Sequence, residues 1–155
     1  MRFQRAVFLL AEIADVYSFH ENVRNIEKVM PPTVRIRRVE AGLPARAGSA
    51  FYLEMALFFV PLQWHGRWEI AERPHRLVDV SRTFPFSHWR HEHRFERESG
   101  GTRMTDTVDF ELPWYLGGKL IGATVFSLLF AWMFAIRHRR TGHYFRHADR
   151  SARQP

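Results

Sequence analysis

The chain has 155 residues, of which 46% are hydrophobic and 15% aromatic, so it carries enough apolar side chain for one domain with a real core. It contains no cysteine, which excludes disulfides, thiol catalysis and zinc sites with cysteine ligands, and which fits a reducing compartment. The net charge of +7 is mostly terminal, because residues 137–155 contain six arginines and one aspartate, which leaves +2 for the other 136 residues.

The beginning of the chain predicts a strand followed by two short helices. Apolar side chains dominate residues 2–12, which we expect to form the strand. Because acidic residues interrupt the apolar run, it does not have the pattern of a secretory signal, and we expect a cytoplasmic protein. Asp15 is the expected N-cap of the first helix. The second helix begins near Val23 and ends at Met30, since Pro31-Pro32 cannot continue it.

From Thr33 onward, the pattern is that of β-strands joined by short connections. Four strands are expected before residue 86, at Val34–Val39, Phe51–Leu62, Trp64–Ile70 and Leu77–Val80. Together with the first strand and a following hairpin they make seven strands. This number and these short connections predict a single, strongly curved antiparallel sheet.

The segment Phe86–Leu112 predicts a β-hairpin with polar residues on its apolar face. Polar and apolar side chains alternate in both runs, and the apolar faces carry Trp89, His91, His93 and Phe95 in the first run and Met104, Asp106, Val108, Phe110 and Leu112 in the second. If Glu98–Gly101 form a four-residue loop, His93 lies opposite Asp106 with Cβ atoms about 5 Å apart. A two-residue Gly-Gly loop would shift each pair by two residues without exchanging the faces.

The predicted His93–Asp106 pair has two alternative roles. In the structural interpretation, it is a satisfied polar pair that fixes the register of the strands. In the chemical interpretation, Asp106 orients His93 as a general base, and His91 on the same face orients a substrate oxygen. The residue types of His91, His93 and Asp106 would also suit a metal. A histidine that donates to an aspartate accounts for the same pattern, so we expect no metal and no cofactor.

The final element is expected to be a long helix from about Tyr115 to His138. Its segment Leu120–Ile136 is seventeen residues without a charge, at the lower limit for a membrane span, and we expect it to pack across the concave face of the sheet instead. Residues 141–155 are expected to form a basic, flexible tail that makes at most weak contact with an anionic membrane. No Walker-type, RNP-type or zinc-finger pattern occurs, so we expect no nucleic-acid partner.

The order of one strand, two short helices, six strands and a long helix is that of the helix-grip fold, and several short motifs add to this order. These motifs are Phe19-His20, Asn25-Ile26, Pro31-Pro32, Pro61 with Trp64, Leu77-Val78-Asp79, Pro85-Phe86, Trp89-x-His91-x-His93-x-Phe95, Gly101-Thr102, Thr105-Asp106, and Phe134 with Arg137. Over residues 2–140 the sequence resembles the START-like superfamily of lipid-transfer domains, birch-pollen-allergen-like proteins and polyketide cyclases, in particular its small bacterial ligand-binding members. The resemblance implies an α+β fold in which a seven-stranded curved antiparallel sheet wraps around the C-terminal helix, with the ligand-binding domain at residues 1–140.

The expected function is binding of a hydrophobic small molecule or lipid in an internal cavity between the sheet and the last helix, for transport or sequestration. We expect the cavity to be lined by Met55, Leu57, Trp68, Trp89, His91, His93, Phe95, Met104, Asp106, Val108, Phe126 and Phe130. The alternative is an enzyme of the cyclase, hydratase or isomerase kind that uses His93 and Asp106 with His91 beside them, its reaction class resting on the analogy of fold. A second alternative is a membrane-peripheral accessory protein. Because release of the apolar helix from the sheet would expose the core, this alternative keeps only the form in which the arginine tail alone rests on anionic lipid. We expect a binding protein rather than an enzyme.

Overall fold

A computed structural model describes residues 1–116 and 122–152 of the chain. It contains the predicted single seven-stranded antiparallel sheet, and its strand order is β1-β7-β6-β5-β4-β3-β2. The strands are β1 (Arg2–Leu9), β2 (Val34–Ala41), β3 (Ala50–Leu57), β4 (Val60–Glu72), β5 (Arg76–Ser81), β6 (His88–Glu98) and β7 (Gly101–Glu111). The helical elements are α1 (Ile13–Glu21), the 3₁₀ turn η1 (Val23–Asn25), α2 (Ile26–Val29), the 3₁₀ turn η2 (Trp114–Leu116), the π-helical turn η3 (Gly122–Phe126) and α4 (Ser127–Ala152).

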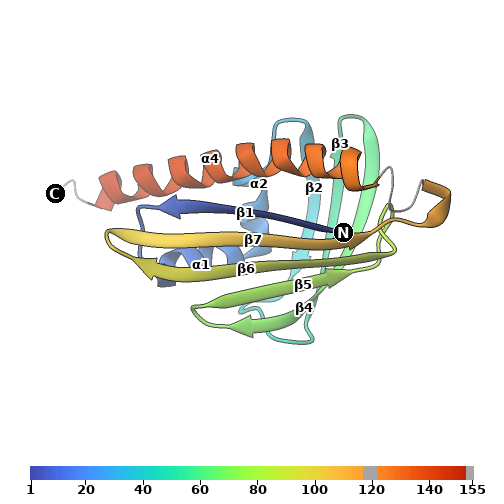
Figure 1. Ribbon diagram of the computed structural model, residues 1–155. Coiled ribbons are helices and arrows are strands. Elements are labelled where there is room, and N and C mark those ends of the chain that lie inside the picture. The colour runs from blue at the N-terminus through green and yellow to red at the C-terminus, as the bar shows by residue number, and fades with distance from the viewer. Residues whose placement is uncertain (117–121, 153–155) are drawn as a thin grey trace.

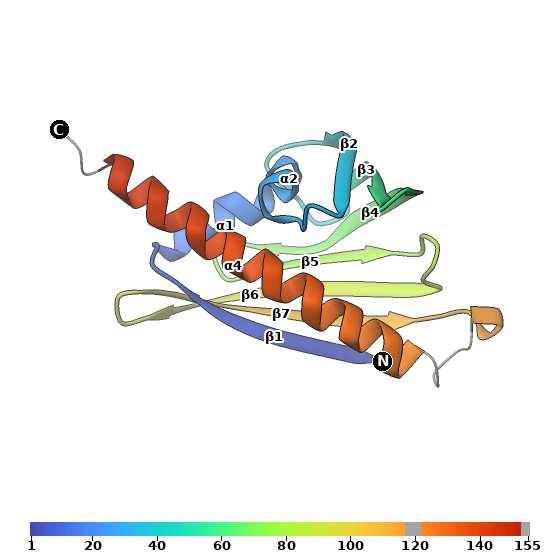
Figure 2. The same cartoon turned by 90° about the horizontal axis from the view of Figure 1, so that it is seen from above.

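The sheet is strongly curved, and the helices lie on its concave side. Figure 1 shows β2 and β3 turned steeply relative to β1 and β7, with α4 lying over the sheet. Seen from above, α4 crosses the strands diagonally, and it contacts β1 and α2 (Figure 2). The seven strands, the short helices after the first strand and the long final helix confirm the predicted architecture.

The central hairpin has the predicted register. His93 lies opposite Asp106 in the β6–β7 pair. The pairing continues to Glu98 and Gly101, so the turn consists of Ser99 and Gly100 alone and is shorter than the predicted four-residue loop. Gly100 has a φ of 81°, which side chains rarely tolerate. The shorter turn keeps the same pairs, and the polar residues therefore stay on the concave face.

The helix start predicted at Asp15 is wrong. The N-cap of α1 is Glu12, and Asp15 lies in the first turn, where a negative charge interacts favourably with the helix dipole. The predicted end of the second helix is confirmed, because α2 ends at Val29 and Met30 is its extended C-cap. Pro31 follows directly, as expected from its inability to continue a helix.

The single strand predicted at Phe51–Leu62 is also wrong, because the chain reverses within it. Phe58 and Phe59 form an exposed turn between β3 and β4, and Phe58 has a φ of 56°. Phenylalanine is not one of the residues that usually form turns, so this apolar run gives no sign of the reversal. The strand predicted at Trp64–Ile70 is the continuation of β4.

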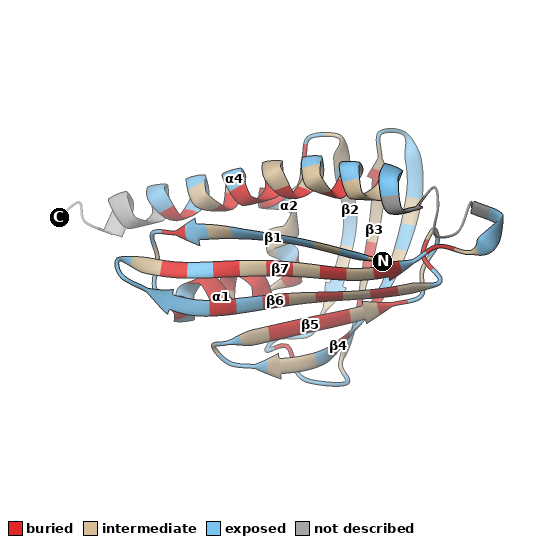
Figure 3. Ribbon diagram, viewed as in Figure 1, coloured by how far each residue is buried: buried red, intermediate tan, exposed pale blue. Residues whose placement is uncertain are grey.

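The helix α4 extends well beyond the predicted end of the last helix at His138. Its buried residues follow a stripe of period four that faces the sheet (Figure 3). Thr141 and Phe145 belong to this stripe, and Phe145 packs against Phe19. Residues 141–147, which were expected to belong to the tail, thus lie in α4, with Thr141 and Phe145 buried against the domain.

The predicted helical segment Leu120–Ile136 is described only from residue 122, and residues 120–121 lie outside the described part. In the described part of the chain, no helix has the length and apolar character needed to cross a bilayer.

Candidate functional site

A pocket of about 380 Å³ lies between the concave face of the sheet and the helices. Its walls are mostly apolar, and β3, β4, α2 and α4 all contribute to them. Val60 and Phe84 line the pocket and are also exposed, so the pocket opens to solvent beside these two residues. The polar wall residues include His20, Asp79, His91, His93 and Arg137.

Eight of the twelve residues predicted to line the cavity lie in the wall of this pocket. They are Met55, Leu57, Trp68, Trp89, His91, His93, Phe126 and Phe130. Phe95, Met104, Asp106 and Val108 are buried but are not among the wall residues, so their predicted position is corrected.

Neighbouring elements cover these four side chains and separate them from the pocket. The ring of Phe95 packs against Tyr17 and His20, so α1 covers it. Strand β7 lies between β1 and β6, close to the crossing α4, and its inward side chains are covered there by neighbouring side chains. Asp106 is one of these inward side chains, and histidine side chains contact both of its carboxylate oxygens.

Asp106 is the centre of a buried histidine cluster, and its exposed fraction is 0%. The Nε2–H of His91 donates to Oδ1 at 3.0 Å, and the Nε2–H of His138 donates to Oδ2. Nδ1 of His93 lies 2.5 Å from Oδ1 but lacks the angle of a hydrogen bond. The carboxylate of Asp106 thus joins β6, β7 and α4 in one polar contact.

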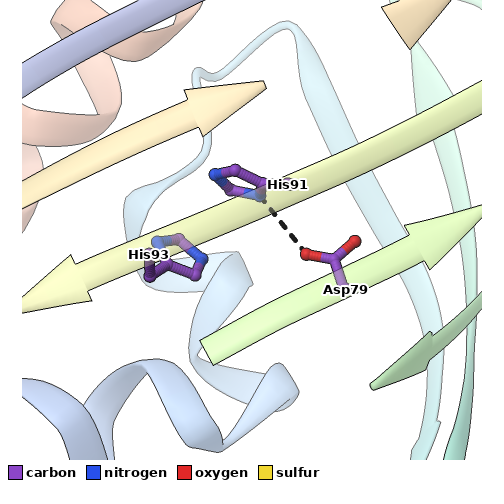
Figure 4. A group of neighbouring side chains, drawn as sticks. All are labelled: Asp79, His91 and His93. Carbon is purple, nitrogen blue, oxygen red and sulfur yellow. Dashed lines mark ion pairs between the residues drawn. The ribbon is translucent and has the colours of Figure 1, made fainter. Parts of the chain in front are cut away.

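His91 lies between two aspartates. Its Nδ1 is 3.4 Å from Oδ2 of Asp79 on β5, and Figure 4 shows the two side chains facing each other. The indole Nε1–H of Trp89 donates to Oδ1 of the same carboxyl group at 3.2 Å. The side chains of Trp89 and His91, which are two residues apart on β6, therefore orient Asp79.

Comparisons with known proteins identify the fold but no sequence family. No family model and no curated protein matches the sequence. Protein NE0264 from Nitrosomonas europaea is 15% identical, with a TM-score of 0.74 over 96% of both chains. Protein SA2116 from Staphylococcus aureus, whose function is unknown, is 12% identical, with a TM-score of 0.75 over 97% of this chain and 96% of that one.

A third similar structure is the di-domain ARO/CYC protein StfQ from the steffimycin biosynthetic pathway. It is 8% identical, with a TM-score of 0.72 over 97% of this chain and 52% of StfQ. The chain shares the helix-grip fold of these structures. At these identities the similarity concerns the fold, and the site has to be interpreted from its own residues.

In this helix-grip domain, the buried pair of Asp106 and His91 is held in its charged form. Burial acts to raise the pKa of Asp106, but the facing His93 and the hydrogen bonds from His138 and His91 outweigh it and hold this pKa well below its usual range. Burial acts to lower the pKa of His91, but hydrogen bonds to Asp106 and Asp79 raise it above the usual value. The two carboxyl groups thus stabilise the protonated form of His91.

His93 and His20 are held neutral by the same surroundings. Burial lowers the pKa of His93 to about 3, and the neighbouring charge of His91 acts in the same direction. Burial lowers the pKa of His20 well below its usual value, and His93 and Arg137 add to the effect. The two rings lie side by side with centroids 5.1 Å apart. The polar end of the pocket thus contains neutral imidazoles as well as charges.

Among the residues that the structure describes, Asp79, His91 and His93 form a group that could hold a metal ion. One ligand atom from each lies within 4.8 Å of the others (Figure 4), and two histidines with one carboxylate suit zinc or iron(II). The carboxylate in this group is Asp79, whereas the set considered from the sequence contained Asp106. Both nitrogens of His91 already face carboxyl groups, so the contacts above account for these side chains without a metal ion.

Sequence reasoning missed four polar residues of the site: His20, Asp79, Arg137 and His138. His138 was treated only as the expected end of the last helix, although it follows Phe130 and Phe134 at intervals of four residues and therefore lies on the same helix face. That spacing is the signal by which it could have been found. The other three occur in the motifs of the resemblance, but nothing in their local spacing points to a pocket.

Proposed function

We propose that the protein binds a hydrophobic small molecule in the pocket between the sheet and α4. The observation that carries the proposal is the pocket itself, because about 380 Å³ lies within the range of roughly 300–1,000 Å³ typical of small-molecule sites. Its walls combine many apolar side chains with a few polar groups at one end, which is the usual composition of such sites. The StfQ similarity adds that a protein containing this fold comes from the steffimycin biosynthetic pathway.

The electrostatics of the site favour binding over the general-base alternative. A base works best when its pKa lies near the working pH, and the pKa of His93 is about 3. The oxygens of Asp106 are shared among His91, His93 and His138, so this carboxylate orients several rings and does not serve one base alone.

Native mass spectrometry of the gently purified protein tests whether a hydrophobic molecule occupies the pocket. We expect a mass above that of the chain, and release of a small hydrophobic molecule on denaturation. Addition of 1-pyrenebutanol, a neutral fluorescent probe, to the delipidated protein should give a saturable increase in fluorescence.

A matched pair of variants on β3 links this binding to the pocket. Met55→Trp places a large ring in the pocket wall, whereas Tyr52→Trp makes a similar change at a side chain that packs against His65 outside the pocket wall. We expect at least about tenfold weaker probe binding for Met55→Trp, since overfilling removes the space for the ligand, and little change for Tyr52→Trp. An empty purified protein that also fails to bind the probe, or equal binding by both variants, would contradict the proposal.

A further inference from the structure

Arg137 is a buried cation in the pocket wall without a counter-ion. Its exposed fraction is 9%, and its guanidinium carbon lies 5.5 Å from the ring centroid of Phe134. Across the described ranges 1–116 and 122–152, no carboxylate lies within ion-pair distance of Arg137, and its Nε has no hydrogen-bond partner. An isolated buried charge is strongly unfavourable unless an opposite charge pairs with it.

The two buried carboxyl groups of the site are already engaged by other donors. Asp106 accepts from His91 and His138, and Asp79 accepts from Trp89 and faces His91. Among the described residues, neither carboxyl group lies within ion-pair distance of Arg137. A bound ligand is therefore a candidate source of a partner for this guanidinium.

A second unpartnered group in the same wall points to a ligand. His20 has an exposed fraction of 8%, and its Nδ1 lies 2.8 Å from the carbonyl oxygen of Val16. Because a carbonyl only accepts, Nδ1 carries the proton of the neutral ring, which leaves Nε2 as an acceptor. This Nε2 is buried in the pocket wall and has no partner.

We infer that the pocket ligand is an amphipathic monocarboxylate, whose carboxylate pairs with Arg137 while its apolar body fills the apolar part of the pocket. This inference rests on the proposed function. One unpaired guanidinium matches one negative charge, and its planar fork matches the two oxygens of a carboxylate. The Nε2 of His20 is a second polar atom in the same wall that lacks a partner.

Binding of 1-pyrenebutanoate and 1-pyrenebutanol, measured by fluorescence titration, tests the inference, because the two probes share one apolar body and differ in the head group. We expect the wild-type protein to bind the acid at least about tenfold more tightly than the alcohol, the usual effect of a charge-assisted hydrogen bond. Arg137→Gln should abolish this preference, and Arg137→Lys should restore part of it. The control Arg139→Gln removes an exposed charge from the same helix and should preserve the preference.

Thermal denaturation of the ligand-free proteins provides a second measurement. Since Arg137 is buried without a partner, Arg137→Gln should fold with a Tm equal to or above that of the wild type. Equal binding of acid and alcohol by the wild type would overturn the inference and leave the proposed function intact. Failure of both probes to bind would instead count against the proposed function. Equal loss of acid binding in the Arg137→Gln and Arg139→Gln variants would assign the preference to general surface charge and overturn the role of Arg137.

Discussion

Replacing Asp106 by asparagine is the most direct perturbation of the buried histidine cluster. Asp106 has an exposed fraction of 0%, and the change keeps the size of its side chain but removes its negative charge. His91 and His138 both donate to this carboxylate, and His91 is held in its charged form. Removing one partner of a buried ion pair destabilises a protein by about 3–5 kcal/mol, because the remaining charge stays buried.

We therefore expect Asp106→Asn to lower the free energy of unfolding by about 3–5 kcal/mol at pH 6. For a domain of this size, the loss corresponds to a decrease in Tm of roughly 6–20 °C. The pKa of folded Asp106 lies below that of the unfolded chain, so its contribution is present above about pH 4 and is lost as the pH falls through the folded pKa. The difference between wild type and variant should accordingly shrink below about pH 4.

Urea denaturation followed by far-ultraviolet circular dichroism measures this difference, and Asp109→Asn is the matched control. Asp109 lies on the same strand and forms two hydrogen bonds with the exposed Arg2, at 2.7 and 2.9 Å. Such a surface pair contributes about 1 kcal/mol or less. If Asp106→Asn lost no more stability than Asp109→Asn, the reasoning that Asp106 organises the buried histidines would be refuted.

Three further predictions concern the pocket and the long helix. The imidazole NMR signals of His93 should not titrate between pH 5 and 8, because its pKa is about 3, and a midpoint near 6.5 would show that the ring is not desolvated. Phe145→Ala should lower the free energy of unfolding in thermal denaturation by about 3 kcal/mol, whereas the exposed neighbour Arg146→Ala should change it by less than about 0.5 kcal/mol, and equal effects would mean that this end of α4 is not packed. Gly66→Ala should be destabilised by about 1–3 kcal/mol and should bind 1-pyrenebutanol more weakly, since the added Cβ would lie 2.2 Å from the ring of Phe51 in the pocket wall, and unchanged binding would exclude this displacement into the pocket.

The hairpin could be predicted from the sequence because local rules determine it. Period-two alternation assigns the faces of β6 and β7, and a short turn at Gly100 aligns His93 with Asp106. The reversal at Phe58-Phe59 was hidden because neither residue favours a turn, so only the pairing of β3 with β4 reveals it.

The composition of the pocket was less predictable, because it depends on which helix residue meets which strand. The alternation of polar and apolar residues indicated that Asp106 faces inward. It did not indicate that His138 would donate a hydrogen bond to one of the Asp106 oxygens. The arginine-rich composition after Arg137 resembles a solvated tail, although Thr141 and Phe145 continue the buried stripe of α4. Long-range contacts of this kind are set by the crossing of α4 over the sheet, which no local pattern encodes.

The position of Asp106 makes the two halves of α4 unequal. Near its start, Phe126 and Phe130 meet Phe86 through ring contacts alone, and such contacts can slide and re-form at little cost. Further along, His138 is tied to Asp106, and separating them would strand a charge in the core. The contacts that hold α4 over the pocket are therefore aromatic near Phe130 and electrostatic at His138, so substitutions at the first position probe packing and substitutions at the second probe a buried charge.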